Sequence, residues 1–472
     1  MARAGVVLPR LLADRLGLST ELADVMARAG FFPLRHRGRA LADAACSLAA
    51  GATCLSDIEA MTAREEIFGP GGGASDTTML RVLDELAGRL RADGLPGRAL
   101  ARATAGARAS SRAGMADRHG QLPAVKVAGK DLARPAAEGE RARPVLVAGL
   151  DATLIEAASP GAQAAGTFKQ GFGFHPLTAW CTNVGDALAV MLRPGNAGSF
   201  TACDHIKVPD ASFGQIPAPW RTDVLVTIDG AGASREVIAR LTALDTAAVH
   251  GKRGRRAEYS IGWPADERTL AGISELRERD RGIAADADGK ADPGAGAADL
   301  TGILRAGPGG DRLATWPAGL RVIARRFPRP AGKQARLGED ADREYGAFAT
   351  STAAGQARWL DARHRTRAHV EDRVRQFRAC GAASLPSTGY DRNAAWLQLA
   401  ALATSLTAWL RHVALDGDLA RAATRTLRFR ILSAPARLVT HARRKILKVP
   451  PGWEWAHDLA GARDRLQAMH PA

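Results

Sequence analysis

The sequence predicts an α/β fold, with a central sheet in the middle of the chain and helical regions on both sides of it. Two short apolar runs indicate the sheet: residues 145–147 lead towards Asp151, and residues 224–228 lead into Asp229. Runs of this length and β-branched content are typical of buried strands. Segments with the apolar spacing of helices occur before residue 100 and after residue 366, so strands and helices share one chain.

An acidic residue closely follows each of these two runs. A single acid at the end of a strand is usually a solvated side chain, because Asp mostly lies exposed. The recurrence favours a second interpretation, in which neighbouring strands of one sheet bring Asp151 and Asp229 to the same edge. Two carboxylates that close repel each other unless a cation lies between them. Oxygen ligands suit Mg²⁺ or Mn²⁺, ions that support phosphoryl chemistry.

The composition indicates a polyanionic partner. The 472 residues suffice for two or three domains, and 65 Lys and Arg against 49 Asp and Glu leave a formal net charge of +16. An excess of this size points to nucleic acid; a bias of the whole composition towards Ala, Gly and Arg is the alternative explanation.

The cysteines and the apolar runs exclude other classes. The five cysteines are scattered and never in C-x-x-C spacing, which argues against a disulfide framework or a zinc site. No apolar stretch reaches the roughly 18 residues of a membrane span, and the N-terminus lacks a long apolar signal region. We therefore expect a soluble, intracellular protein without a membrane partner.

Residues 1–100 predict a helical N-terminal region that binds DNA. Ser56 with Glu59 has the spacing of a capping box, and Ser75 or Asp76 would cap the helix that follows. Helix, short turn and helix in a basic protein fit a DNA-reading module, but an ordinary helical bundle has the same pattern. Residues 101–143, rich in Ala, Gly and Arg without a clear period, predict a basic linker or an arm that becomes ordered on DNA.

Residues 144–244 predict the first part of the catalytic core. After Asp151 we expect a strand over residues 172–181, a turn at residues 183–186 and a returning strand over residues 187–192. A helix near residues 204–206, the strand that ends in Asp229 and a helix over residues 234–244 complete the segment. Three strands linked as hairpins, then a helix and a fourth strand, give the order expected of an RNase H-like core.

Residues 245–345 predict a β-rich insertion in that core. Residues 258–263 and 320–326 read as strands, and the Gly, Ala and Asp-rich stretch between them reads as a loose loop. A basic run either contacts DNA phosphates or is a solvated loop; its members are Lys252, Arg253, Arg255 and Arg256.

Residues 346–415 predict the second part of the core. The helix over residues 366–380 carries Glu371, with Arg367 four residues before it and Arg375 four residues after it. This is an ordinary helical charge pattern; it would also place a third metal-binding carboxylate between arginines that bind phosphate, with Arg378 as a further DNA contact. An apolar helix over residues 393–412 should bury Trp396 and Trp409. Residues 416–472 form a basic C-terminal region whose charge density favours a surface that faces DNA.

Several stretches together resemble the DDE transposases of bacterial insertion sequences, specifically those of the insertion sequence 1380 family. They are spread over nearly the whole chain and include LADAACSLAAGATCLSDIEAM, IFGPGGGASDTTMLRVLDEL, LDATLIEA, TFKQGFGFHPL, RPGNAGS, HVEDRVRQFRACG, LPS, NAAWLQLAALA and TAWLRHVAL. The resemblance implies an RNase H-like core interrupted by a β-rich insertion, and it implies that Asp151, Asp229 and Glu371 are the metal-binding carboxylates. Asp361 and Asp372 are substitutes for Glu371. The family pattern also includes Lys169, a candidate DNA contact, with His175 and Asn196.

The sequence departs from the family pattern at several positions. The family usually has a second acid where Gly149 stands, an Arg at Thr227 and a Ser at Gly230. An acidic-basic motif is replaced by residues 160–163, PGAQ, and an Asn of the apolar helix is replaced by Ser405. These changes put the DNA-positioning residues in doubt, not the three acids.

The resemblance implies a cut-and-paste transposase with a two-metal mechanism that uses Mg²⁺, with Mn²⁺ possible. Such an enzyme would cleave double-stranded DNA at the terminal inverted repeats of its element and join the ends to target DNA, as a homodimer on DNA. Trp263 could stack on a displaced base or belong to the core. The alternatives are a stand-alone RNase H-like nuclease, which cuts but does not join, and a non-catalytic DNA-binding remnant.

Overall fold

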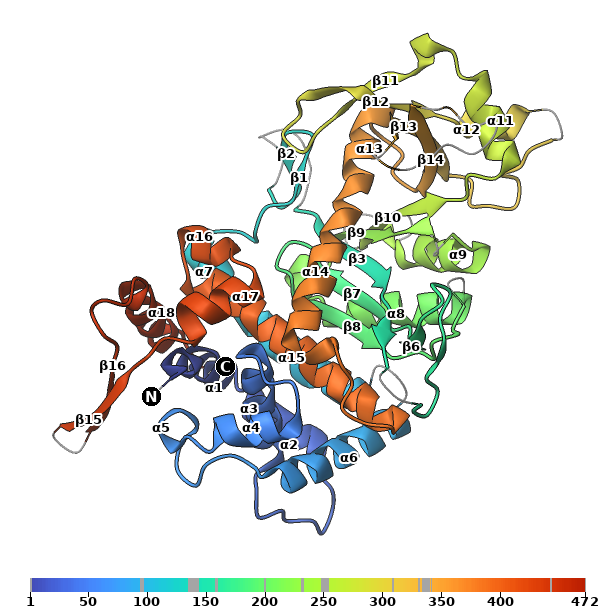
Figure 1. Cartoon of the computed structure of the whole chain (residues 1–472). Helices are drawn as coiled ribbons and strands as arrows, with labels where there is room; N and C mark the ends of the chain where they lie inside the picture. Colours follow the sequence, from blue (N-terminus) through green and yellow to red (C-terminus); the bar gives the residue numbers. More distant parts are fainter. Residues whose placement is uncertain are drawn as a thin grey trace.

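The structure, a computed structural model, has a half built on a large sheet and a helical half, connected by the long helix α15 (Figure 1). It describes residues 2–93, 97–134, 144–157, 160–198, 201–230, 233–247, 254–307, 310–329, 332, 340, 342–441 and 444–471.

The large sheet contains the four strands that the sequence predicts for an RNase H-like core. The expected strand over residues 172–181 was wrong in its extent, because residues 172–174 form β6 in a separate small sheet and only residues 177–181 form β7. With β10, which was expected in the insertion and pairs with β9, the core strands make five neighbours. Across the sheet they run β8-β7-β3-β9-β10. The first three in the chain pair antiparallel, and β9 and β10 lie parallel to β3. Their bounds are β3 Leu146–Ala152, β7 Leu177–Cys181, β8 Ala187–Met191, β9 Asp223–Ile228 and β10 Arg256–Trp263.

Four further strands extend the same sheet beyond β10, in the order β14-β13-β12-β11. The expectation of a loose loop in this region was wrong, because part of the Gly, Ala and Asp-rich stretch forms β11 and β12. Small residues have weak strand propensity by themselves, but β12 pairs with β13, whose Val322 and Ile323 are fully buried. The bounds are β11 Gly282–Ala285, β12 Ala291–Asp299, β13 Arg321–Pro328 and β14 Arg343–Thr350. Helix α11 (Glu267–Glu275) precedes β11, and α12 (Thr301–Ala306) lies between β12 and β13 in the chain.

Helices cover both faces of the core sheet, and the alternation of side chains along β3 shows which face is which. Leu146, Ala148 and Leu150 share a core cluster with residues of α8 and α9. Gly149 points the other way, towards Val370 of α14. Asp151 therefore lies on the face that α14 covers. The helices are α8 Ala202–Gln215, α9 Arg235–Leu244, α13 Ala357–Arg365 and α14 His369–Phe377.

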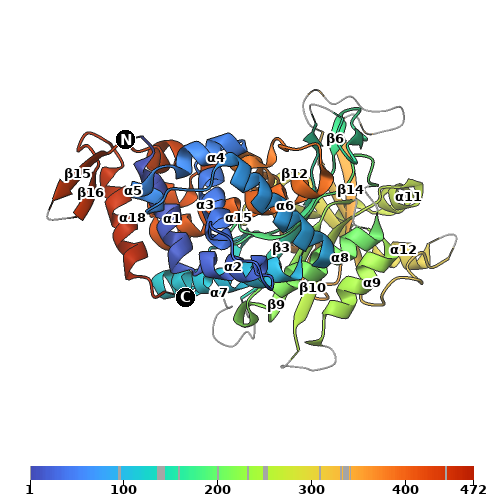
Figure 2. The ribbon, with the colours of Figure 1, turned by 90° about the horizontal axis from the view of Figure 1, so that it is seen from below.

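The helical half is assembled around α15, which comes from the C-terminal part of the chain. Helices from the N-terminal region pack on α15, as does α18 near the C-terminus (Figures 1 and 2). Trp396 and Trp409 of α15 are fully buried, as predicted. No helix among the described residues is long and apolar enough to cross a membrane. The bounds are α1 Val7–Arg15, α2 Leu18–Met26, α3 Arg37–Ala49, α4 Leu55–Thr62, α5 Glu65–Phe68, α6 Asp76–Asp93, α15 Tyr390–Ala414, α16 Gly417–Arg421, α17 Thr424–Leu427 and α18 Ala456–Ala468.

The helix caps differ in part from those predicted. Ser75 caps α6 as expected, since its Oγ accepts a hydrogen bond of 3.3 Å from the backbone N–H of Thr78. The capping box at Ser56 was wrong: α4 begins one residue earlier, at Leu55, so Ser56 lies inside the helix. Asp57 instead accepts hydrogen bonds from Thr53, which orders the turn before α4.

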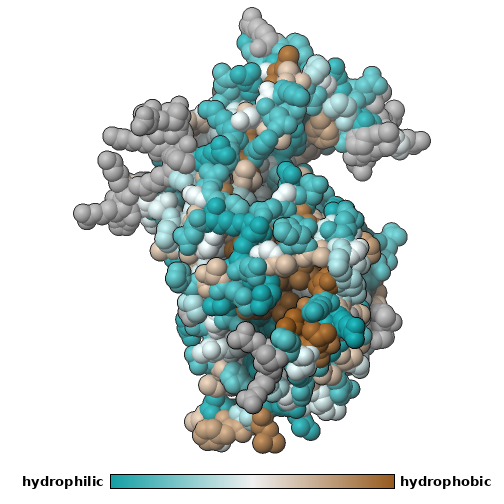
Figure 3. Space-filling model, turned by 90° about the vertical axis from the view of Figure 1, so that its left-hand side faces the viewer, coloured by the Kyte–Doolittle hydropathy of each residue, from teal (hydrophilic) through white to brown (hydrophobic). Residues whose placement is uncertain are grey.

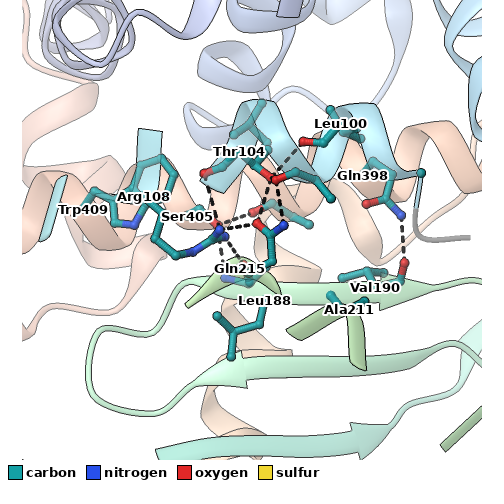
Figure 4. Close-up of a pocket in the computed structure, with 16 residues that line it drawn as sticks. Leu100, Thr104, Arg108, Leu188, Val190, Ala211, Gln215, Gln398, Ser405 and Trp409 are labelled. Atoms are coloured by element: carbon teal, nitrogen blue, oxygen red, sulfur yellow. Dashed lines mark hydrogen bonds between the residues drawn. The ribbon is translucent and has the colours of Figure 1, made fainter. Parts of the chain in front are cut away.

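The first part of the segment predicted as a linker, residues 101–119, is a helix instead, within α7 (Arg98–His119). Its inward side carries Arg108 and Arg112, both buried, which pair with the buried Asp186 at 2.7 Å and 3.5 Å. Trp409 donates a hydrogen bond of 3.1 Å to the same carboxylate. Figure 4 shows Arg108, Gln215 and Ser405 converging where α7, α8, β8 and α15 meet. The sequence pattern failed because, between Leu100 and Met115, the buried face of α7 is made of Ala, Arg and Ser and not of large apolar residues.

Candidate active site

Asp151 and Asp229 lie side by side at the carboxyl ends of two parallel strands. In the register of β3 and β9, Gly149 pairs with Thr227 and Leu150 pairs with Ile228. One residue further along, Asp151 and Asp229 come next to each other. Alternation along both strands puts the two acids on the same face as Gly149 and Thr227. The predicted juxtaposition of these two acids is therefore present.

The helix that carries Glu371 lies against this edge of the sheet. Val370, Val374 and Phe377 of α14 are buried and form a cluster with strand residues, and the ring of Phe377 lies 5.3 Å from that of Trp180 on β7. These three positions follow the spacing of one helix face. Glu371 is the next residue after Val370 and is exposed, so the packing of α14 holds it beside the acids of the sheet.

The three acids form one electrostatic cluster. Burial is the largest cause that raises the pKa of Asp151 to about 7, and the charges of Asp229 and then Glu371 act in the same direction. The backbone N–H of Ala152 and the guanidinium of Arg367 act against them. A carboxyl whose pKa is raised by two other acids is one that a cation would stabilise in its charged form.

Carboxylate oxygens are the donors that Mg²⁺ or Mn²⁺ requires, so the donor set fits such an ion. The side chains are not arranged as a finished ligand set, however. Among the residues that the structure describes, no three His, Cys, Asp or Glu side chains converge closely enough to hold a metal ion. Asp151, Asp229 and Glu371 would hold the ion only after their side chains turn towards a shared position.

The two substitutes for Glu371 are engaged elsewhere. Asp361 is buried and pairs with Arg325 and with Arg365, whose Nε lies 3.1 Å from its carboxylate. Asp372 pairs with Arg373 at 3.3 Å and with Arg375 at 3.1 Å. Of these three acids, Glu371 is the one among the main causes of the raised pKa of Asp151.

Some of the predicted DNA contacts surround the acids. Arg367 is close enough to lower the pKa of Asp151. Arg378, in the π-helical turn after α14, donates a hydrogen bond of 3.0 Å to the hydroxyl of Thr153, two residues after Asp151. Arg375 is three-quarters exposed and pairs with Asp372. Cations therefore border the acids on the side of α14.

A small three-stranded sheet borders the cluster on another side and carries Lys169 in an exposed turn. The ring of Phe168 lies 5.4 Å from that of His175, and the Nζ of Lys169 lies 5.7 Å from the centre of Phe168. Asn196 is in the turn next to Ala197, whose carbonyl contacts the Nδ1 of His175 at 3.2 Å. The strands are β4 Ile155–Glu156, β5 Ala165–Gly166 and β6 Phe172–Phe174.

Sequence reasoning missed one residue of the site, His205 of α8. Burial lowers the pKa of His205 and of His175, and the charge of Asp229 acts in the opposite direction on both. Both imidazoles therefore lie within electrostatic reach of Asp229. No signal in the sequence distinguishes His205 from an ordinary core histidine, because its role depends on how α8 is placed against β9.

The described residues of the basic run 252–256 lie far from the acid cluster. Arg256 starts β10 and pairs in register with Asp223, which starts β9. Asp229 follows the other end of β9, about 20 Å away for six residues of strand. Arg255 is directed towards the same far end, where its Nε donates a hydrogen bond of 2.9 Å to the carbonyl of Leu244. Lys252 and Arg253 lie outside the described residues.

Four of the five departures from the family pattern lie at defined contacts in the structure. Gly149 and Thr227 are direct register partners, so the acid and the Arg expected at these positions are lost together from neighbouring sites. Ser405 of α15 accepts a hydrogen bond of 3.1 Å from the N–H of Ala187 and so connects α15 to β8. In the loop 160–163, Ala162 donates a hydrogen bond of 2.8 Å to the carbonyl of Thr388. Gly230 is exposed, and nothing in the structure explains the loss of a Ser there.

Trp263 belongs to the core. Its side chain is buried and its ring lies 4.8 Å from that of Trp316. Stacking on a displaced base needs an exposed ring, so this alternative has no support at Trp263.

Comparison with known proteins gives one match at the level of the sequence family. The model of a family described as transposase DDE domain, group 1, matches residues 1–471. No curated protein matches the sequence. Among solved structures, the cryo-EM structure of a piggyBac transposase synaptic complex with hairpin DNA is similar, with a TM-score of 0.44 and 9% sequence identity over 98% of this chain and 85% of that chain. The family match covers the segments that carry Asp151, Asp229 and Glu371.

Proposed function

Because this chain belongs to the family of group 1 transposase DDE domains, we propose that it is a cut-and-paste DNA transposase, of the insertion sequence 1380 family. It cleaves DNA at the ends of its element and joins these ends to target DNA. Asp151, Asp229 and Glu371 hold two divalent ions, Mg²⁺ or Mn²⁺, for both steps. The observation that supports this most directly is the pKa of Asp151, raised to about 7 by burial and by the two other acids.

In the proposed mechanism the chain contributes charge and position. The carboxylates of Asp151 and Asp229 are held by paired strands, and that of Glu371 by a docked helix. The ions supply activation of the attacking hydroxyl and stabilisation of the leaving oxygen. Arg367 and Arg378, at the edge of the cluster, bind the phosphates on either side of the scissile bond. No covalent link between protein and DNA is needed.

The partner in this proposal is double-stranded DNA, first the terminal inverted repeats and then the target. A homodimer on DNA would keep the two ends together, and the protein would act in the bacterial cytoplasm, where the nucleoid lies. The formal net charge of +16 supports a polyanionic partner.

A cleavage and joining assay tests the proposal. DNA that carries the ends of the element is incubated with the protein in Mg²⁺, in Mn²⁺ or in EDTA, together with a target plasmid. We expect breaks at the repeat boundaries and joined products in either metal and none in EDTA. Breaks without joining would indicate a nuclease instead. Binding without breaks in either metal would contradict the proposal and indicate a DNA-binding remnant.

A further inference from the structure

The hairpin of β15 (Arg437–His441) and β16 (Arg444–Lys448) projects from the helical half, away from the sheet (Figures 1 and 2). Its two strands form a separate sheet and pair with no third strand in the part of the chain that the structure describes. A two-stranded hairpin alone is only marginally stable in water. Its exposed position therefore suggests a partner outside the chain.

The base of the hairpin is fixed to the body by aromatic side chains. Phe429 lies 6.2 Å from Trp453 and 5.8 Å from Trp455, and these two rings are 5.5 Å apart. Trp453 donates a hydrogen bond of 3.0 Å to the carbonyl of Arg430, and the guanidinium of Arg430 lies 5.2 Å from the ring centre of Trp455. The hairpin thus starts from a rigid base on the residues before and after it.

The charged side chains of the hairpin are all basic, and no acid is near them in the sequence. Between Asp418 and Glu454 the chain has nine Lys and Arg and no Asp or Glu. Arg437 and Lys448 stand directly opposite each other across the two strands. Like charges in this position destabilise a hairpin, and neither side chain forms an ion pair with another described residue. A polyanion would relieve this repulsion.

The dimensions of the hairpin fit the major groove of DNA. Five residues per strand give a ribbon about 16 Å long, with the strands about 4.8 Å apart. The major groove is about 12 Å wide and about 8.5 Å deep, enough for a two-stranded ribbon. The side of the molecule from which the hairpin projects is hydrophilic over much of its area, with a hydrophobic patch near its middle (Figure 3).

We propose that the β15–β16 hairpin is a DNA-binding ribbon that enters the major groove at a distance from the active site. Arg437, Lys445 and Lys448, all exposed, bind backbone phosphates. Thr440 and His441, near the end of β15, lie where a ribbon reaches base edges. The inference rests on the proposed function for the identity of the partner. A second copy of the chain fits less well, because it carries the same large positive charge.

The test is a measurement of DNA affinity against salt, in EDTA so that no chemistry occurs. The probe is a fluorescent duplex of about 40 base pairs, roughly four helical turns. The ribbon variant is Arg437→Gln, Lys445→Gln and Lys448→Gln together. The control variant removes the same charge from Arg277, Arg421 and Arg463, exposed side chains that pair with their own neighbours Asp280, Asp418 and Asp464.

Each lost phosphate contact lowers the slope of log affinity against log salt by about 0.9. We expect the slope of the ribbon variant to fall by about 2.7 and that of the control by less than about one. The charge-conserving variant Arg437→Lys, Lys445→Arg, Lys448→Arg should keep the slope of the original protein. Equal slopes in the ribbon and control variants, both with the thermal unfolding of the original protein, would overturn the proposal.

Two further results separate the alternatives. A ribbon variant that binds DNA normally but changes its oligomeric state in sedimentation would assign the hairpin to a second copy of the chain and overturn its role in DNA binding. The variant Asp151→Asn should lose cleavage and keep the full salt slope. Failure of cleavage by the original protein would thus contradict the proposed function alone, whereas an unchanged slope in the ribbon variant would contradict only the ribbon.

Discussion

A Cβ atom on Gly149 would lie 2.1 Å from the Cγ2 atom of Val370, so only glycine fits on β3 beneath α14. Since Glu371 follows Val370 directly, this contact fixes how closely the helix of the third acid approaches the strand of the first.

Gly149→Ala should therefore displace α14 and disturb the acid cluster. Overpacking of this kind costs about 1–3 kcal/mol of unfolding free energy, and we expect metal-dependent cleavage to fall with it. Denaturant unfolding measures the first effect and initial cleavage rates the second. The matched control is Gly214→Ala on α8, where an added Cβ meets no atom within 4 Å.

The double variant with Gly149→Ala and Val370→Ala is the decisive comparison. If the clash with Val370 is the cause, the two losses are not additive and the double variant recovers part of the loss of Gly149→Ala. Strict additivity would contradict this explanation.

The raised pKa of Asp151 gives a prediction with a definite sign. In the unfolded chain the pKa of Asp is about 3.9, whereas in the folded protein that of Asp151 is about 7. Between these values the folded state binds more protons, so the free energy of unfolding falls as the pH rises from about 4 to about 7. At pH 8, Asp151→Asn should raise the Tm measured in EDTA, and near pH 4 the difference should disappear. If the original protein and Asp151→Asn had the same Tm at pH 8, Asp151 would not be repelled by the two other acids, and the proposed acid cluster would be refuted.

Addition of a divalent metal should make the original protein more stable than Asp151→Asn at pH 8, the opposite of the result expected in EDTA. Mg²⁺ or Mn²⁺ neutralises the acids, so it should raise the Tm of the original protein at pH 8 in proportion to the logarithm of its concentration. Asp151→Asn should show a much smaller rise, because one of the three carboxylates is missing. A thermal shift series in both proteins measures this.

The assignment of the third acid can be checked with two neighbours on α14. Glu371→Gln should abolish metal-dependent cleavage while DNA binding persists. Asp372→Asn removes the same charge one residue later, from a side chain paired with Arg373 and Arg375, and should keep cleavage within roughly tenfold. If the two variants behave in the opposite way, Asp372 is the third acid.

Asp186 should contribute strongly to stability. Burial raises the pKa of this carboxyl, but Arg112 and Arg108 outweigh burial and lower it overall. Asp186→Asn leaves both guanidinium groups buried without an opposite charge, which typically costs about 3–5 kcal/mol. Denaturant unfolding measures the loss. Asp464→Asn, at an exposed pair with Arg463, should cost under about 1 kcal/mol.

Ser405 should be replaceable by Asn but not by Ala. Ser405→Ala leaves the buried N–H of Ala187 without its acceptor, a loss of about 1–3 kcal/mol. Asn offers a carbonyl oxygen instead, and Ser405 lines a pocket between α7, β8 and α15 that can receive the larger side chain (Figure 4). Ser274→Ala on the exposed side of α11 should change stability by less than about 0.5 kcal/mol.

The strands that carry or precede the two acids, and the place of these acids at the sheet edge, could be predicted from the sequence, because both depend on local apolar periodicity and on the position of the strand ends. The division of residues 172–181 between two sheets could not be predicted, because the apolar pattern continues through both strands. The helical structure of residues 101–119 could not be predicted from the sequence. The buried side of α7 carries Arg108 and Arg112, whose burial depends on Asp186, more than 70 positions further along the chain. The role of His205 and the far position of Arg256 likewise follow from helix placement and strand direction, which local patterns do not contain.

The placement of α15 has a consequence for biosynthesis. The helices of residues 2–93 pack on a helix that starts at Tyr390, so they cannot complete their core when they leave the ribosome. At about 5–20 residues per second, roughly 15–60 s pass before their partner is synthesised. During this interval their apolar faces are open to chaperones, and the helical half forms only once nearly the entire message has been translated.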